Sequence, residues 1–592
     1  MRALFMSLSI AVTVAAVAFA EDWLQWGQDA RHTGQVNVLG QSPSRILADI
    51  IYDPFVSQAQ AEEGGELLAH YQTPLVTGQD VFMEFKSGKY VNCNPLGSYR
   101  TYPCGPDNWN NQIWSEKRLH WSAGNLVTMW EFSSDWKPEP DASGELGDWE
   151  PVFHAAATDD YVFVPGLGGT VWQLSKGSGH VVAHINPFGK SVDPTIFVSG
   201  PLTADSQGNI YYNALQLNIT NDQNTNDPWS YGPNFDGQNA ADIPGAWLVK
   251  INANGSTQMV SYKTLISTAP VTCETTFADD GAQLPWPPSP TAHVQSTVPC
   301  LSQRPGVNVA PAVAPDGTIY SVSVAHNPFA SRFSYIVAFN PNLTLKWAAS
   351  LRGHLNDGCG VLLTGTLGGC RSNANLGVDP ATNEPPAGRV IDQSTSSPTV
   401  TPDGGVLYGA YTLYNFARGH LFRFSAGGQF MAAYDFGWDT TPAIYTHGGT
   451  FSVVLKDNHY DTSSYCYDPT ICPVAPPGPY YITQLNSSLV PEWKFQNTNT
   501  QSCQRNPDGS LSCVSDHPNG FEWCINAPAI DLAGNVYANS EDGNLYVLRQ
   551  GGTSLGNIFM NLALGAAYTP LSLGPDGKIY TQNAGRLFVI GH

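Results

Sequence analysis

Short runs in which apolar and polar residues alternate recur along the chain. The clearest copies are 311–320, 398–408 and 570–580, and each opens with Pro, contains a Pro-Asp-Gly turn and resumes with Ile-Tyr or Leu-Tyr. Alternation with a period of two buries one face of a strand, and Asp-Gly supplies the positive φ that a tight hairpin needs. The pattern therefore predicts a β-hairpin that is repeated many times.

Further copies start at Pro201 and Pro528, and weaker ones at Pro74, His154 and Pro442, which brings the number to about eight. A second hairpin follows most copies, so each unit has the four strands of a propeller blade. A β-helix has a much shorter repeat, and a β-sandwich does not repeat itself in this way. We therefore expect an all-β fold, a single β-propeller of about eight four-stranded blades.

Insertions interrupt the repeats at about 220–245, 265–305, 352–393, 457–479 and 499–524, and they carry most of the 11 cysteines. The cysteines form four close pairs and a trio: Cys93/Cys104, Cys273/Cys300, Cys359/Cys370, Cys466/Cys472, and Cys503, Cys513 and Cys524. We expect disulfides that restrain long loops, with one member of the trio unpaired. No Cys-x-x-Cys occurs, so we assign no metal to the cysteines.

Residues 1–20 have the pattern of a secretory signal peptide. Arg2 is followed by an apolar run, and Ala18-Phe19-Ala20 matches a cleavage site. An uncleaved anchor is the alternative, but the run is shorter than the ~20 residues that span a bilayer. We expect a mature chain of 21–592, without a transmembrane segment, that is secreted or periplasmic.

Charge narrows the range of partners. The chain has 27 Lys and Arg against 49 Asp and Glu, a formal net charge of -22. Such a surface repels the phosphate backbone of a nucleic acid. We therefore expect a protein or a small molecule as partner, and a cationic ligand or Ca²⁺ is compatible with the charge.

Three segments resemble the PQQ-like (quinoprotein) propeller superfamily. Residues 23–34 read Trp-Leu-Gln-Trp-Gly-Gln-Asp-Ala-Arg-His-Thr-Gly, similar to the entry motif of that superfamily, and 170–181 and 542–548 are similar to its blade hairpin. The resemblance implies an eight-bladed ring in which the N-terminal segment pairs with the last blade. Residues 23–34 would then lie near 580–590.

The superfamily contains quinoprotein dehydrogenases and non-catalytic scaffold proteins, so the fold does not settle the chemistry. The dehydrogenases hold the quinone between a Trp and a disulfide of adjacent cysteines, beside Ca²⁺. This sequence has no Cys-Cys dipeptide and no Cys-x-x-Cys-His haem motif. PQQ and Ca²⁺ therefore remain possible cofactors that the residues do not favour.

Residues just before the innermost strand of each blade surround one mouth of a propeller tunnel. Counting back from the repeats gives a mostly polar set, and the candidates for ligand binding are Gln72, His154, Asn308, Asp392, Asp439 and Asn526. Such groups hold a cation, a polar ligand or only water. No His-Glu-x-x-His occurs, so catalytic and metal-binding residues stay unassigned.

The leading hypothesis is an exported propeller that acts as a ligand-binding, protein-binding or scaffold module, because the repeat is strong and no catalytic signature accompanies it. The first alternative is a PQQ- and Ca-dependent oxidoreductase, similar to alcohol or sugar dehydrogenases, with its site at the tunnel mouth. The second is a metal- or carboxylate-dependent enzyme at the same mouth.

Overall fold

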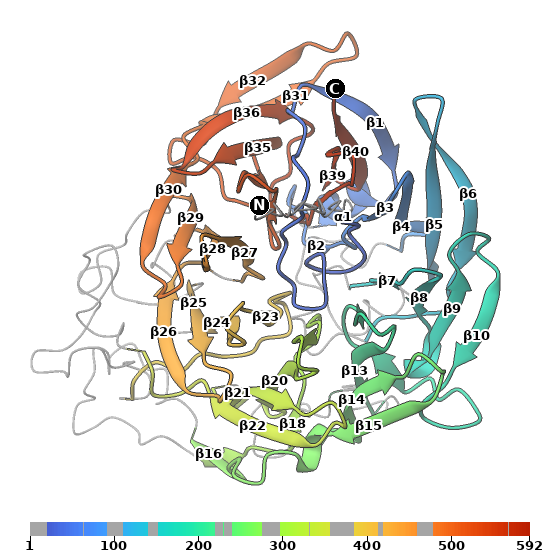
Figure 1. Ribbon diagram of the computed structural model, residues 1–592, viewed down its shortest axis with the longest axis vertical. Coiled ribbons are helices and arrows are strands. Elements are labelled where there is room, and N and C mark those ends of the chain that lie inside the picture. Colours follow the sequence, from blue (N-terminus) through green and yellow to red (C-terminus); the bar gives the residue numbers. More distant parts are fainter. Residues whose placement is uncertain are drawn as a thin grey trace, which may run out of the picture.

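The computed structural model describes residues 21–62, 64–91, 111–139, 152–218, 229, 240–274, 297–330, 332–355, 384–412, 418–437, 439–458, 478–565 and 567–592. Within these residues eight antiparallel sheets stand radially around a common central axis (Figure 1). This confirms the predicted all-β propeller of four-stranded blades. In blades 3 and 4 the innermost strand is split into two short segments.

The blades follow the order of the sequence. Blade 1 consists of β3 (Leu75–Thr77), β4 (Asp80–Gly88), β5 (Gln112–Ser122) and β6 (Asn125–Ser133), and blade 2 of β7 (Ala156–Ala157), β8 (Tyr161–Pro165), β9 (Val171–Ser175) and β10 (Val181–Ile185). Blade 3 consists of β11 (Ile196–Val198), β12 (Thr203–Ala204), β13 (Ile210–Gln216), β14 (Gly245–Ile251) and β15 (Thr257–Ser261). Blade 4 consists of β18 (Gln303–Arg304), β19 (Ala312–Val313), β20 (Ile319–Ala325), β21 (Ser334–Phe339) and β22 (Leu345–Ser350).

Blade 5 consists of β23 (Thr399–Val400), β24 (Val406–Thr412), β25 (Arg418–Phe424) and β26 (Phe430–Asp435), and blade 6 of β27 (Ala443–His447), β28 (Thr450–Asp457), β29 (Tyr481–Asn486) and β30 (Pro491–Gln496). Blade 7 consists of β33 (Ala529–Ile530), β34 (Val536–Asn539), β35 (Asn544–Arg549) and β36 (Thr553–Phe559). Blade 8 consists of β38 (Ser572–Leu573), β39 (Ile579–Asn583), β40 (Arg586–Gly591) and β1 (Arg45–Ile51).

The remaining elements decorate the ring. They are the helix α1 (Val56–Glu62), the short 3₁₀ turns η1 (Leu167–Gly169), η2 (Tyr262–Thr264) and η3 (Pro328–Ala330), the parallel pair β2 (Ala69–His70) and β37 (Ala567–Tyr568), and two hairpins, β16 (Thr272–Glu274) with β17 (Thr297–Pro299) and β31 (Gln501–Arg505) with β32 (Leu511–Ser515). No helix among the described residues is long and apolar enough to cross a membrane.

The predicted repeats coincide with the blades. Each innermost strand, or its second segment in blades 3 and 4, begins one or two residues after the Pro or His that opens a copy, as at Pro74 before β3 and His154 before β7. The Pro-Asp-Gly turns place glycine at positive φ, 81° at Gly317 and 79° at Gly577. The local pattern therefore sets the first strand and the first turn of every blade.

The last blade takes its outer strand from the beginning of the chain. β1 pairs antiparallel with β40, from Arg45 opposite Gly591 to Ile51 opposite Arg586. The resemblance placed residues 23–34 beside 580–590, but the pairing strand begins at Arg45. Residues 23–34 do not form a straight strand because Gly27, Gln28, His32 and Gly34 have positive φ.

Residues 23–38, which we call the tunnel segment, instead follow the inside of the ring (Figure 1). Backbone hydrogen bonds join the segment to the innermost strands of six blades: Trp23 with Val76, Leu24 with Ala157, Ala30 with Val313, Arg31 with Val400, Thr33 with Ile444, and Gly34 and Val36 with Ile530. The Gln25 side chain contacts blade 3 as well, because its carboxamide forms two hydrogen bonds with the backbone of Ala204. The segment therefore satisfies backbone groups that an innermost strand would otherwise leave unpaired.

Two disulfides restrain the insertions. Cys273–Cys300 joins the hairpin β16–β17 and Cys503–Cys513 joins β31–β32, while Cys524 is a buried free thiol. The first pair is as predicted, and the structure resolves which member of the trio stays unpaired. The predicted pairs Cys93/Cys104, Cys359/Cys370 and Cys466/Cys472, and the signal peptide at 1–20, lie outside the described residues.

Gly34 tests the fit of the tunnel segment. Its φ is +63°, and a Cβ there would lie 2.7 Å from the backbone oxygen of Pro528. Gly34→Ala should cost about 1 kcal/mol for the conformation and a further ~1–3 kcal/mol for overpacking. The control is Gly255→Ala, which has a φ of +82° but open space around the new Cβ. Urea unfolding measures both, and equal losses would contradict this close fit.

Candidate functional site

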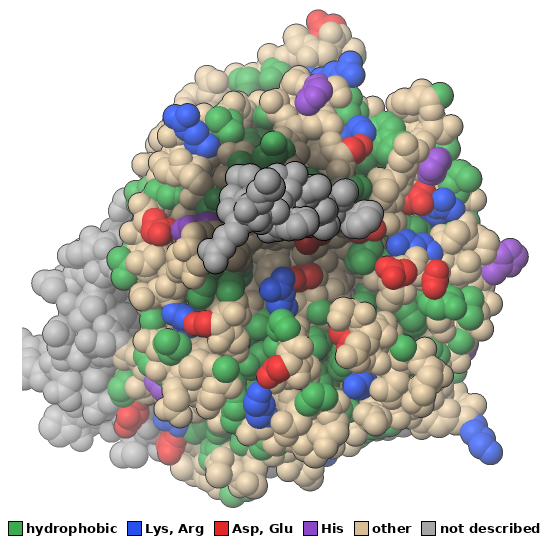
Figure 2. All heavy atoms as spheres, viewed as in Figure 1, with side chains coloured by type: hydrophobic (Ala, Val, Ile, Leu, Met, Phe, Trp, Pro, Cys, Tyr) green, Lys and Arg blue, Asp and Glu red, His purple; other side chains and the backbone are tan. Residues whose placement is uncertain are grey.

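The six predicted mouth residues lie just before the innermost strands of six different blades, or in blade 4 before the second segment of that strand. We call this set the mouth ring. Five members are buried, and Asp392 is half-buried. Trp26 of the tunnel segment reaches this level, where its Nε1 donates to the Thr441 hydroxyl over 3.3 Å and its ring stands edge-on to His154 at 5.7 Å. The face drawn in Figure 2 is hollowed near its centre, where the tunnel segment crosses the ring in Figure 1.

Gln72 joins blades 1, 2 and 8. Its Nε2 donates to Glu116 Oε1 at 3.0 Å, and its Oε1 accepts the Ala155 backbone N–H at 3.0 Å. Its backbone carbonyl accepts a hydrogen bond from Gln582 of blade 8. Both ends of the carboxamide are therefore engaged within the protein.

His154 is a neutral connector between blades 1 and 2. Its Nε2 lies 3.1 Å from the Thr73 backbone N–H, which can only donate, so Nδ1 carries the proton and donates to the Ala155 carbonyl at 2.7 Å. Burial lowers the pKa of His154 to about 3. Because both ring nitrogens are occupied, His154 has no nitrogen left for a metal ion.

Asn308 and Asp392 meet at the junction of blades 4 and 5. The guanidinium of Arg304 grips Asp392 with two hydrogen bonds of 2.9 and 2.5 Å, and Asn308 Nδ2 donates to the Asp392 carbonyl at 3.1 Å. Glu139 interacts electrostatically with both Asp392 and Arg304, and burial raises its pKa to about 8. The arginine therefore holds the Asp392 side chain in place, while Glu139 keeps its proton at neutral pH.

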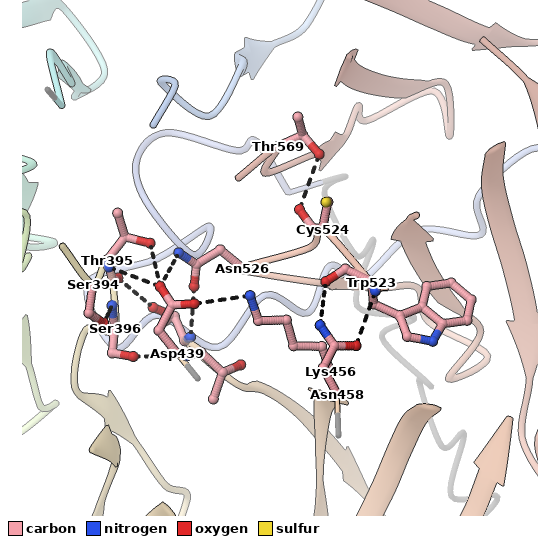
Figure 3. A network of polar contacts seen from close by, with 12 residues as sticks. Ser394, Thr395, Ser396, Asp439, Lys456, Asn458, Trp523, Cys524, Asn526 and Thr569 are labelled. Carbon is pink, nitrogen blue, oxygen red and sulfur yellow. Dashed lines mark hydrogen bonds and ion pairs between the residues drawn. The ribbon is translucent and has the colours of Figure 1, made fainter. Parts of the chain in front are cut away.

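Asp439 is the centre of a polar network between blades 5, 6 and 7 (Figure 3). Its Oδ1 accepts from Lys456 Nζ at 3.0 Å, and its Oδ2 accepts from the Thr395 backbone N–H at 3.1 Å and from Asn526 Nδ2 at 3.3 Å. The side chains of Asp439 and Lys456 are 0% and 2% exposed. The ion pair is thus fully desolvated and held by donors from three blades.

The network continues towards blade 8. Asn458 exchanges two hydrogen bonds, of 3.2 and 3.1 Å, with the backbone of Trp523, and Thr569 donates to the Cys524 carbonyl at 3.2 Å (Figure 3). The Cys524 thiol lies beside Glu541 and Glu522, and burial raises its pKa. The thiol therefore stays protonated and is a poor nucleophile.

The mouth ring thus forms three contacting pairs, Gln72 with His154 through residues 73 and 155, Asn308 with Asp392, and Asp439 with Asn526. Each pair connects neighbouring blades. The sequence identified these positions but missed Glu116, Arg304 and Lys456, the charged groups that pair with them or lie against them. The signal for Lys456 was its position just after the largely apolar run Phe-Ser-Val-Val-Leu.

The described residues do not fit the Ca²⁺ site that quinoprotein dehydrogenases would need. Among them, no group of three His, Cys, Asp or Glu side chains converges as metal ligands. The two aspartates of the mouth ring, Asp392 and Asp439, are paired with Arg304 and Lys456. The quinone's usual pair of adjacent cysteines is missing from the whole sequence. We derive no step through PQQ or Ca²⁺.

No protein-family model matches the chain, and neither does any curated protein. Solved structures do match. The quinohemoprotein alcohol dehydrogenase from Comamonas testosteroni has a TM-score of 0.50 and 11% identity, covering 98% of this chain and 82% of that chain.

A europium-containing methanol dehydrogenase has a TM-score of 0.47 and 10% identity, over 95% and 89% of the two chains. BamB from Moraxella catarrhalis has a TM-score of 0.37 and 10% identity, over 80% and 94%. At such low identity the likeness shows only the fold. The chain has the fold of the PQQ-like propellers.

Lys456→Met tests the buried ion pair. Removing the ammonium leaves Asp439 charged and buried, so we expect a loss of about 3–5 kcal/mol in the free energy of unfolding. In the double variant with Asp439→Asn the two losses should not add. The control is Lys346→Met, which breaks an exposed pair with Asp316 and should cost at most about 1 kcal/mol. Equal losses for Lys456→Met and Lys346→Met in urea titrations would contradict this role.

Glu116 gives the pH dependence a definite sign. Burial raises its pKa from 4.5 to about 8. Between these pH values the folded state keeps a proton that the unfolded state releases, so stability falls as pH rises, by at most ~1.4 kcal/mol per pH unit. Below pH 4.5 and above pH 8 this contribution is constant.

Glu116→Gln should flatten this slope, because its neutral amide has no proton to hold. The free energy of unfolding of the variant minus that of the parent protein should therefore be larger at pH 8 than at pH 5. Urea unfolding of both proteins at the two pH values measures this difference. The exposed Glu131→Gln is the matched control and should leave the slope unchanged. A slope that is the same in all three proteins would contradict the buried, protonated state of Glu116.

Proposed function

We propose that this chain is an exported ligand-binding module that holds a small polar ligand at the mouth of its propeller tunnel. Hydroxyl and carboxyl groups that lie beside the mouth ring form the binding surface. The two disulfides in the insertions support an oxidising compartment, as in the periplasm or outside the cell.

One observation carries the proposal. Buried side-chain atoms at the mouth lack a hydrogen-bond partner within the described part of the chain: the hydroxyl groups of Thr73, Ser199 and Thr440, and one carboxyl oxygen each of Glu116 and Glu139. Buried polar atoms in folded proteins nearly always have a partner, either in the protein or in water or a ligand. These atoms are therefore the groups to which we propose that a bound polar molecule supplies the missing hydrogen bonds.

The protonation states favour a ligand that is not an anion. Glu116 and Glu139 hold protons at neutral pH because burial raises the pKa of each to about 8, so they offer hydroxyl donors as well as carbonyl acceptors. The cationic groups Arg304 and Lys456 are committed to Asp392 and Asp439. Nothing in this arrangement activates a nucleophile, which supports binding rather than catalysis.

Thermal unfolding in the presence of glucose, sorbitol, glycine betaine, spermidine, or PQQ with Ca²⁺ tests the proposal. We expect at least one of the first four to raise the melting temperature. Ser199→Ala and Thr440→Val should each remove about half or more of that shift, because each removes one hydrogen bond to the ligand, worth about 1 kcal/mol. The exposed Thr446→Val is the control.

The same samples distinguish the oxidoreductase alternative. Reduction of a redox dye by alcohols or sugars after addition of PQQ and Ca²⁺ would overturn the proposal in favour of a quinoprotein. A panel without any shift, or shifts that the two mouth variants leave unchanged, would also overturn it.

A further inference from the structure

A groove on the outside of blade 7 lies far along the chain from most of the mouth ring and plays no part in the proposed function. It is a cavity of about 460 Å³ between the hairpin β31–β32, the end of β30 and the strands β35 and β36. Figure 1 shows this hairpin projecting outward beyond β36 at the rim of the ring. The hairpin forms one wall of the groove and the blade forms the other.

Aromatic rings form the blade side of the groove. Phe495, Tyr546 and Phe559 line it. Phe495 and Tyr546 lie 6.0 Å apart between ring centroids, and the buried Trp523 packs against both at 6.0 and 5.2 Å. Phe495 and Phe559 remain partly exposed. A rigid aromatic cluster therefore presents ring surfaces to whatever enters the groove.

Side-chain carboxamides surround these rings. Those that line the groove are Gln496, Asn497, Asn499, Gln501, Asn544 and Asn557. Asn557 donates to Asn544 at 3.3 Å and Asn499 donates to Asp542 at 3.0 Å, so hydrogen bonds hold several of them in place. Each amide offers both donors and an acceptor.

The residues that line the groove are uncharged, although the chain as a whole carries a net charge of -22. None of the described residues that line it is Lys, Arg, His, Asp or Glu. The contrast is a cavity of about 710 Å³ beside the tunnel segment, which is lined by several aspartates, among them Asp159 and Asp160. The composition of the groove therefore selects for a neutral ligand.

The hairpin wall is fixed in place before any ligand arrives. Cys503 and Cys513 are paired across β31 and β32 and joined by a disulfide. Arg505 of the same hairpin donates to the Phe559 carbonyl at 2.8 Å, and its guanidinium lies 5.5 Å from the centre of the Phe559 ring. A preorganised wall lowers the entropy lost on binding.

From these observations we infer that the groove binds a neutral oligosaccharide. The apolar C–H faces of a sugar ring pack on aromatic rings, and its hydroxyl groups pair with carboxamides, which donate and accept hydrogen bonds as the hydroxyls do. A second cavity, of about 420 Å³, shares the residues Gln496, Asn497 and Thr498 with the groove. The binding surface thus continues past this loop, which suits a chain of sugars better than a single one.

Isothermal titration calorimetry with four neutral hexasaccharides tests the inference: cellohexaose, maltohexaose, xylohexaose and chitohexaose, with hexagalacturonic acid as the charged counterpart. We expect at least one neutral hexasaccharide to bind and the acidic one to bind at least about tenfold more weakly. Phe559→Ala and Asn557→Ala should each weaken binding about tenfold, which corresponds to about 1.4 kcal/mol.

Matched controls come from β15 of blade 3, where Met259 and Gln258 are exposed. Met259→Ala and Gln258→Ala should leave the affinity unchanged. The double variant Cys503→Ser/Cys513→Ser should weaken binding while circular dichroism shows an intact β fold, because only the wall is loosened.

Binding of the hexasaccharide in the groove should not depend on the tunnel mouth. The mouth variant Thr440→Val should therefore leave the affinity for the hexasaccharide unchanged. Failure of all four neutral hexasaccharides to bind would overturn the inference. So would equal affinity for hexagalacturonic acid, or an affinity that Phe559→Ala and Asn557→Ala leave unchanged.

Discussion

Backbone hydrogen bonding along the tunnel is the constraint on which the rest of this structure depends. The innermost strand of every blade has one edge paired with its own sheet and one edge facing the axis. Unpaired N–H and C=O groups inside a protein are costly. The tunnel segment meets these edges one after another, from Val76 in blade 1 to Ile530 in blade 7. It thereby ties blades together that otherwise touch only their neighbours.

The charged side chains at the mouth also serve to hold the ring together. The charged groups hold neighbouring blades together, with Arg304 on Asp392 and Lys456 on Asp439, and they are therefore not free to act on a substrate. What is left is a set of hydroxyl and protonated carboxyl groups. The groove on blade 7 is built differently, since its hairpin wall β31–β32 is an insertion outside the eight blade sheets. An insertion is free to change without disturbing the blades that carry it.

The parts of the fold that depend on local sequence were predictable, and the parts that depend on distant contacts were not. The Pro-Asp-Gly turns set each hairpin, so the inner strands begin where the repeats begin, and Cys273–Cys300 follows from close spacing. The path of residues 23–38 depends on the blades that surround it, which no local pattern describes. For the same reason the position of Asp439 was evident from the repeat, but its partner Lys456 was not, because the two meet only once the blade has folded.

The pairing of β1 with β40 also governs when the ring can be completed. Arg586 and Asp49, which pair across this closure, are 537 positions apart in sequence. Contacts between such distant residues form late, because a long loop must close first. During synthesis β1 therefore waits without its partner until residues 586–591 have been made. In the meantime β1 is an unpaired strand, and unpaired strand edges expose a folding chain to aggregation.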